Sequence, residues 1–245
     1  MRTRITRGLS AVLAVSALSL TAACGGSDDA KKDGADKPAA GGSASASAAP
    51  TSQAPAATPL TAAQMKAAAL EAKDLPAGWK VKKGEDDNTV YKADKAECQP
   101  LAAMMSAGIE GATQGASVDF VIGNNASELS QEVATFPAGT GAADYTKKIV
   151  AALDGCASFS VEAEGQKLKL ESKKLTAPQG AEEAIAFGLT LEVAPGIKIA
   201  PNLVVARQGA GVFRMLHLAD AAAAKKDFDG LAKTATDKFV KAAQG

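Results

Sequence analysis

The feature that most constrains the fold is an alternation of apolar and other residues late in the chain. Ile185, Phe187, Leu189, Leu191 and Val193 occupy every second position. Because successive side chains of a strand point to opposite faces, a period of two predicts a strand with one buried face. Four further segments alternate in a similar way and predict strands of their own: 159–163, 168–170, 197–206 and 212–218.

The remaining segments predict helices around this sheet. Thr61 and Gln64 fit a capping box, which predicts a helix beginning near residue 61. We expect helices at 61–73, 98–109, 142–153 and 223–242, and earlier strands at 79–82, 117–122 and 129–136. Short turns between successive strands favour antiparallel pairing. The sequence therefore predicts a single α+β domain at 61–245, an antiparallel sheet with helices packed mainly on one face.

The first 23 residues have the pattern of a lipoprotein signal peptide. Arg2, Arg4 and Arg7 precede an apolar run at 9–20 that is too short for a permanent membrane span. Small residues then lead to Cys24, a pattern that resembles the bacterial lipobox, in which the cysteine thiol receives a diacylglyceryl group. The alternative is an ordinary secretory signal. We expect Cys24 to be the lipid attachment residue and the protein to lie at the outer face of the cell membrane.

Residues 24–60 predict a disordered tether. They contain almost only Ala, Gly, Ser, Thr, Pro, Asp and Lys, which cannot form a core. A passive spacer and a platform for modification are the alternatives. Without residues 1–23 the chain has 24 basic and 27 acidic residues, because three of its 27 basic residues lie in the signal peptide. This balance predicts that the membrane is contacted through the lipid alone, and it gives no reason to expect a nucleic acid partner.

Two cysteines remain in the folded part, Cys98 and Cys156. An exported chain with an even number of thiols favours one disulfide between them. A thiol nucleophile or a redox pair is the alternative. With one histidine and three cysteines in the whole sequence, neither a multi-histidine metal site nor a four-thiolate zinc site can form, and we expect no metal and no cofactor.

Four side chains are candidate ligand contacts. Arg207 and Arg214 lie on the two strands of the last predicted hairpin and would suit an anionic ligand, unless they are ordinary sheet residues. Trp79 follows Pro76 and Gly78 and belongs either to a cleft floor or to the core. His217 shares a strand face with Phe213 and Met215, so a half-buried sheet position competes with a general base or pH sensor.

Three short motifs, in this order, resemble a known family. They are Leu75-Pro76-Ala77-Gly78-Trp79, Cys98-Gln99-Pro100-Leu101 and Cys156-Ala157-Ser158-Phe159. The order is similar to that of the PknH-type extracellular sensor domains of mycobacterial serine/threonine kinases and of their stand-alone actinobacterial lipoprotein relatives. The resemblance implies an α+β fold with a cleft, and ligand sensing rather than catalysis. The sensor domain of the kinase has two disulfides, whereas this sequence can form one, so no cleft residues are carried over.

These observations predict a lipid-anchored, extracytoplasmic binding or sensor-like lipoprotein without catalytic activity. Its ligand would be an unknown small molecule, lipid, glycan or peptide. One alternative is an envelope hydrolase that uses His217, although no G-x-S-x-G motif is present. The other is a structural or partner-binding envelope protein, which would expose a flat apolar patch.

Overall fold

The computed structural model describes residues 57–83, 89–123, 126–194, 196–219 and 221–245, and the side chains of 194 and 221–226 are not described. The predicted signal peptide, Cys24 and most of the predicted tether lie outside these residues. Among the helices in the described ranges, none combines the length and the hydropathy that a membrane span requires.

The described strands form one sheet in which every pairing is antiparallel. The order across it is β1-β3-β4-β10-β9-β7-β6-β5-β2, with β8 also beside β7. The strands are β1 (Lys80–Lys82), β2 (Lys92–Ala93), β3 (Thr113–Ile122), β4 (Ser127–Thr135), β5 (Ser158–Ala163), β6 (Gln166–Leu175), β7 (Glu183–Ala194), β8 (Ile197–Ile199), β9 (Asn202–Gln208) and β10 (Gly211–Ala219). The predicted α+β class and antiparallel sheet are confirmed.

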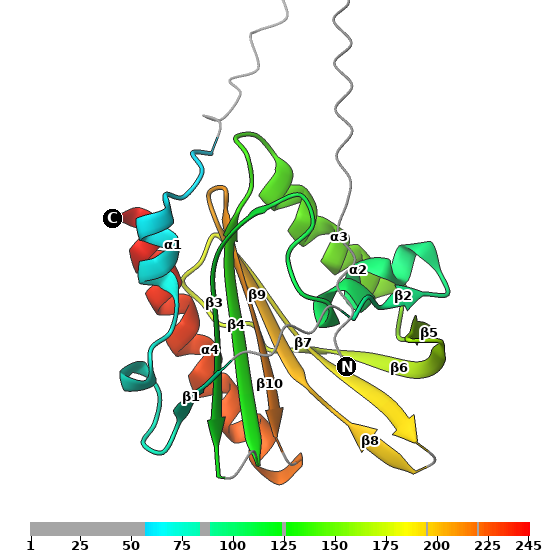
Figure 1. Ribbon diagram of the computed structural model, residues 1–245. Coiled ribbons are helices and arrows are strands. Elements are labelled where there is room, and N and C mark those ends of the chain that lie inside the picture. Colours follow the sequence, from blue (N-terminus) through cyan, green and yellow to red (C-terminus); the bar gives the residue numbers. More distant parts are fainter. Residues whose placement is uncertain (1–56, 84–88, 124–125, 195, 220) are drawn as a thin grey trace, which may run out of the picture. The chain divides into compact units, whose positions relative to one another are not determined.

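The helices lie on both faces of this sheet (Figure 1), which differs from the expectation that they pack mainly on one. They are α1 (Ala62–Ala68), α2 (Gln99–Ala102), α3 (Gly141–Gly155) and α4 (Ala221–Gln244). Helix α1 contacts α4, β3 and β4, and α4 also contacts β9 and β10. Helix α3 contacts α2, β6, β7 and β9.

The sequence of β9 explains this arrangement. Leu203, Val204, Val205 and Ala206 form an unbroken apolar run in which every residue is buried. Val204 and Ala206 pack in the core under α1 and α4, whereas Leu203 and Val205 pack in the core under α2 and α3. A strand that is apolar on both sides needs cover on both faces, and the helices supply it.

The first helix begins where the sequence predicts and ends earlier. Thr61 caps it, because the Thr61 hydroxyl accepts from the Gln64 amide at 3.2 Å and the Gln64 side chain accepts from the Thr61 amide at 2.9 Å. The helix ends at Ala68 rather than near 73. The Leu70 amide donates instead to Oε1 of Gln131 on β4, at 2.7 Å, so a sheet residue replaces the next helical hydrogen bond.

Candidate ligand-binding cleft

A cleft of about 630 Å³ opens on the sheet face that carries α2 and α3. Its floor is formed by β3, β4 and β10, and its roof by residues 103–108. We call residues 103–108 the roof segment; it begins with the 3₁₀ turn η3 (Ala103–Met105), directly after α2. The cleft is lined by Val81, Lys82, Met104, Ala107, Gly108, Gln114, Ser117, Val118, Asp119, Ser130, Gln131, Glu132, Leu203, Arg214, Met215 and Leu216.

The floor changes from polar to apolar across the sheet. In one cross-strand row Asp119 stands opposite Ser130, Ser130 opposite Leu216, and Leu216 opposite Leu203. Ser130 is exposed and Asp119 is half-buried, so polar groups face the opening on the β3 side. The short serine side chain leaves room for a ligand above the sheet. The row therefore offers hydrogen-bonding groups at one end and hydrocarbon at the other.

Arg214 ties the roof segment to this floor. Its Nη2 pairs with a Glu132 carboxylate oxygen at 2.6 Å. Its Nη1 donates to the Ala103 carbonyl oxygen at 3.1 Å, and Nη2 also donates to the Ser106 carbonyl oxygen. One side chain thus satisfies two roof carbonyls and one floor carboxylate. Arg214 therefore fixes the height of the cleft, and its charge is already neutralised.

Two further contacts hold the roof segment. The Tyr145 hydroxyl on α3 donates to Sδ of Met104 at 3.4 Å, and burial raises the pKa of Tyr145 to about 12. Cys98, at the start of α2, and Cys156, at the end of α3, lie in disulfide-compatible positions with their Cα atoms 5.7 Å apart. Both cysteines are fully buried. Because both contacts lead to α3, that helix positions the roof.

One charged side chain of the cleft lining stands apart from the ion pairs around it. Lys82 pairs with Glu128 at 3.1 Å, and Arg214 pairs with Glu132. Asp119 has no ion pair or hydrogen bond to any described side chain, although Lys82 stands opposite it in the sheet. The lining has two cations, Lys82 and Arg214, and two carboxylates, Glu132 and Asp119. Asp119 is the one among the four that has no ion pair with a described residue. An anionic ligand would meet repulsion here, whereas a hydrogen-bond donor would find an open acceptor.

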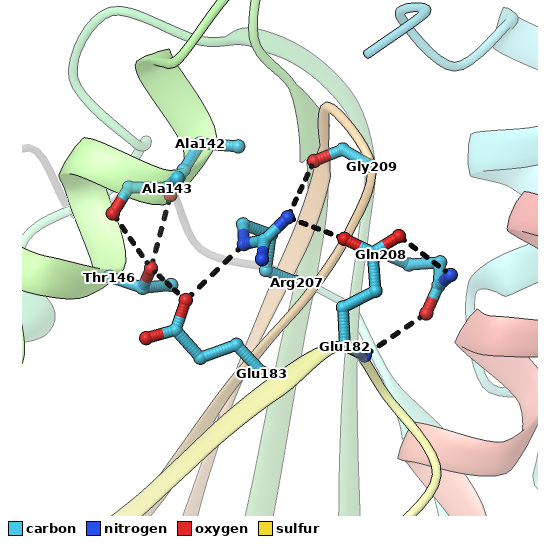
Figure 2. A network of polar contacts seen from close by, with 8 residues as sticks. All are labelled: Ala142, Ala143, Thr146, Glu182, Glu183, Arg207, Gln208 and Gly209. Carbon is cyan, nitrogen blue, oxygen red and sulfur yellow. Dashed lines mark hydrogen bonds and ion pairs between the residues drawn. The ribbon is translucent and has the colours of Figure 1, made fainter. Parts of the chain in front are cut away.

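Arg207, a predicted ligand contact, lies in a separate network on the same sheet face (Figure 2). Its Nη1 pairs with Glu182 at 2.6 Å and its Nε with Glu183 at 3.3 Å. The Thr146 hydroxyl on α3 donates to the same Glu183 oxygen at 2.6 Å. Each predicted arginine thus has its own carboxylate partners. The two do not converge as the anion clamp that their spacing suggested.

Trp79 and His217 lie on the opposite face from the cleft, in the core under α1 and α4. Trp79 is 8% exposed and His217 is fully buried. Their rings are 6.2 Å apart, and the imidazole stacks on Phe228 of α4 at 6.4 Å. Nε2 of His217 lies 3.0 Å from the Ser127 hydroxyl. Neither side chain reaches the cleft, and burial lowers the pKa of His217.

A second, smaller hollow of about 380 Å³ lies over β5, β6, β7 and β8 on the other sheet face. Lys169, Glu171, Glu192 and Lys198 alternate in sign across it, and Lys169 and Lys198 each stand opposite Glu192. Such a surface is largely self-neutralising. In the part of the chain that the structure describes, no group of three or more histidine, cysteine or acidic side chains is arranged to hold a metal ion.

Of the residues that line the cleft, sequence reasoning singled out Arg214 and none of the other polar floor residues. Ser117, Asp119, Ser130 and Glu132 are the polar positions of two alternating strands. The alternation on β3, Ser117-Val118-Asp119-Phe120, was visible, but such positions are ordinarily solvated sheet surface. Only the roof segment turns this surface into a cleft.

The comparisons with known proteins bear on the fold. No family model matches the chain, and no curated protein matches its sequence. Among solved structures, the extracellular domain of PknH from Mycobacterium tuberculosis matches with a TM-score of 0.52. The chain is similar in fold to that domain. The match covers 76% of this chain and 98% of the PknH domain at 15% sequence identity, so the likeness concerns fold alone. The structural resemblance that the three motifs predicted is confirmed.

Proposed function

We propose that this protein is a lipid-anchored, extracytoplasmic binding or sensor-like module that holds its ligand in the cleft. The observation that carries the proposal is the floor beneath the roof segment. There the exposed Ser117 and Ser130 and the partner-free carboxylate of Asp119 face a volume of about 630 Å³. A few polar groups in a preformed concave site are the usual means of orienting a small ligand.

The position of His217 supports binding over hydrolysis. The hydrolase alternative required His217 to lie in an accessible cleft beside a hydroxyl or carboxylate. Ser127 is within hydrogen-bonding distance, but the imidazole is fully buried on the opposite side of the sheet. A substrate in the cleft would have no contact with this pair. The cleft's own cations are held in ion pairs, as expected of groups that shape a site.

The proposed location rests on the N-terminal sequence and on the fold. The lipobox-like segment ending at Cys24 supports export and diacylglyceryl attachment, so the membrane is a partner through the lipid. The similarity to an extracellular domain is consistent with a position outside the cytoplasmic membrane.

Native mass spectrometry tests this proposal on the full lipoprotein released from its own membrane. The wild-type protein should carry a bound mass in addition to its acyl chains. Ser130→Trp fills the centre of the cleft and should remove that mass. Ser158→Trp is the matched control, because Ser158 is also an exposed strand residue but lies at the second hollow. A wild-type protein without bound mass, or loss only in the Ser158 variant, would contradict the proposal.

A further inference from the structure

The cleft floor continues into an exposed apolar surface along β8. The segments β8 and β9 keep one register against β7, since Leu203 stands opposite Phe187 and Ile199 opposite Leu191. By strand alternation, Ile199 and Ile197 therefore point to the same sheet face as Leu203. Leu203 is buried under the roof segment, whereas Ile199 is 37% and Ile197 58% exposed. Apolar surface thus runs from the cleft to solvent.

Val193 extends this surface on the facing strand. It is two residues from Leu191 on the same strand, lies at the irregularity in the pairing of β7 with β8 beside Ile197, and is 39% exposed. We call Val193, Ile197 and Ile199 the apolar stripe. Strand β8 pairs with β7, whereas the last pairing of β10 with β9 joins His217 to Asn202, so no described strand pairs with the other side of β8 (Figure 1). Adjacent exposed aliphatic side chains continuous with a cleft indicate a ligand contact surface.

The charges of the cleft floor restrict which ligands can occupy the cleft and the apolar stripe at the same time. At the polar end, the cations Lys82 and Arg214 are paired, and the Asp119 carboxylate is the charged lining group without an ion pair to a described residue. Serine hydroxyls accept and donate, and a carboxylate only accepts, so this end suits a head group with O–H or N–H donors. A phosphate or carboxylate head would face Asp119, and both cations of the lining are already held in ion pairs. At the other end, hydrocarbon fits the stripe.

We propose that the ligand is an amphiphile with a hydrogen-bond-donating head group that carries no negative charge. The head lies beside Asp119 and Ser130 under the roof segment, and an alkyl chain passes over Leu216 and Leu203 onto the apolar stripe. This inference rests on the proposed binding function and names its ligand class. Hydroxyl-bearing and ammonium-bearing heads share the required chemistry, and the experiment below separates them.

Photolabelling of the full-length lipoprotein in vesicles of its own membrane tests the inference. Three probes share one dodecyl chain with a diazirine near its end and differ in the head group, which is maltoside, primary amine or phosphate. We expect saturable labelling by the maltoside, the amine or both, competed by the unlabelled alkyl compound. The adduct should map to the peptides that contain Ile199 and Leu216. The phosphate probe should label these peptides at least about tenfold less.

Two variants test the location of the chain. Ile199→Asp places a charge on the stripe and should lower labelling about tenfold, since a buried aliphatic contact is lost. Val150→Asp, on the outer surface of α3, is the matched control, because Val150 is 36% exposed, close to the value for Ile199. It should label like the wild-type protein.

Other outcomes overturn the inference. Equal labelling by all three head groups would mean that the stripe contacts bulk membrane or the protein's own acyl chains. Adducts confined to peptides N-terminal of residue 57, or no effect of Ile199→Asp, would exclude the stripe. Native mass spectrometry could show a ligand that Ser130→Trp removes while no probe labels the stripe. In that case the proposed binding function stands, and the proposal that the ligand is an amphiphile is wrong.

Discussion

Arg214 on β10 and Glu132 on β4 stand directly opposite each other in the sheet and form an ion pair at 2.6 Å. The two side chains are only 12% and 13% exposed. The same guanidinium donates to the carbonyl oxygens of Ala103 and Ser106. The pair thus fixes the roof segment above the floor, and it accounts for the partial burial of an arginine that the sequence alone presented as a ligand contact.

Replacing Arg214 with methionine should lower the free energy of unfolding strongly. The variant leaves the Glu132 carboxylate and two carbonyl oxygens without their donor in a nearly buried place. Removing one partner of a buried ion pair costs about 3–5 kcal/mol, so a loss of roughly 3 kcal/mol is expected in urea unfolding. Hydrogen exchange of the roof segment should also become faster.

The matched control for that variant is Lys174→Met. Lys174 forms an ion pair with Asp154, and both side chains are well exposed. Because exposed pairs contribute about 0–1 kcal/mol, this variant should unfold nearly as the wild-type protein does. Equal losses in the two variants would show that Arg214 has no special role in holding the roof.

Gly115→Ala should destabilise the contact between α1 and the sheet. Gly115 lies at the irregularity in the pairing of β3 with β4. A Cβ at this position would lie 2.5 Å from Cβ of Met65, which belongs to the buried surface of α1. Overpacking of this kind costs about 1–3 kcal/mol. Gly155→Ala is the control, since nothing lies within 4 Å of its added Cβ. Thermal unfolding should separate the two variants.

The predicted disulfide leads to a test on thiols. Protein from the cell envelope, denatured without reductant, should show no titratable thiol at Cys98 or Cys156. Replacing both by serine should lower the free energy of unfolding by roughly 2–4 kcal/mol, because the bond closes a long loop in the unfolded chain. The structure places the two residues 58 positions apart in sequence and 5.7 Å apart in space. Two reactive thiols would refute the bond.

The strands with one buried face could be predicted from the sequence. The burial of β9 on both faces was not predicted. The alternation at Ile185, Phe187 and Leu189 marks β7 because each of these residues packs in the α2/α3 core. The unbroken apolar run in β9 requires helices on both faces of the sheet. A search for alternating apolar residues does not detect such a run. Strand β2, of two residues, has no periodic signal, and its residue Ala93 donates its amide to the Gln99 side chain rather than to a strand.

The candidate cleft could not be predicted from the sequence, for a related reason. Glu132 and Arg214 become neighbours only when β4 pairs with β10, and the pairing of distant strands is not encoded in local periodicity. Asp119 looks like any polar residue on the outer face of a strand until the roof segment lies over it. The sequence identified the arginines as candidates by residue type, and their carboxylate partners became visible only in the structure. Ligand contact by either arginine stays a prediction.

Cys24→Ala tests the anchor, which lies outside the described residues. If the thiol carries the diacylglyceryl group, the variant should remain as an unprocessed precursor or lose its partitioning into the detergent phase. Labelled palmitate should enter the wild-type protein and not the variant, because the variant lacks the thiol that would receive the diacylglyceryl group. Unchanged, palmitate-positive material from the variant would show that Cys24 is not the attachment residue.

The final prediction concerns the buried imidazole of His217. The Ser127 hydroxyl donates to the Leu218 carbonyl oxygen at 3.3 Å, so we infer that Nε2 of His217 carries a proton and donates to Ser127. Nδ1 then has a bare lone pair, and it has no hydrogen-bond partner within the described structure. Charging the ring would create a second N–H without an acceptor. Burial accordingly lowers the pKa of His217, and Asp227 opposes the shift to a smaller extent.

A lowered pKa in the folded state fixes the sign of the pH dependence. The unfolded chain has a histidine pKa of about 6.5, so between the lower folded value and about 6.5 the unfolded state binds more protons. The free energy of unfolding should therefore be highest above about pH 6.5 and should fall as the pH decreases toward 5.

His217→Gln keeps an N–H donor for Ser127 and cannot become charged. Since His217 is the single histidine in the sequence, the difference in slope between the two proteins isolates its contribution. Urea unfolding at several pH values should give a flatter curve for the variant, and identical slopes would mean that the buried imidazole titrates as it does in water.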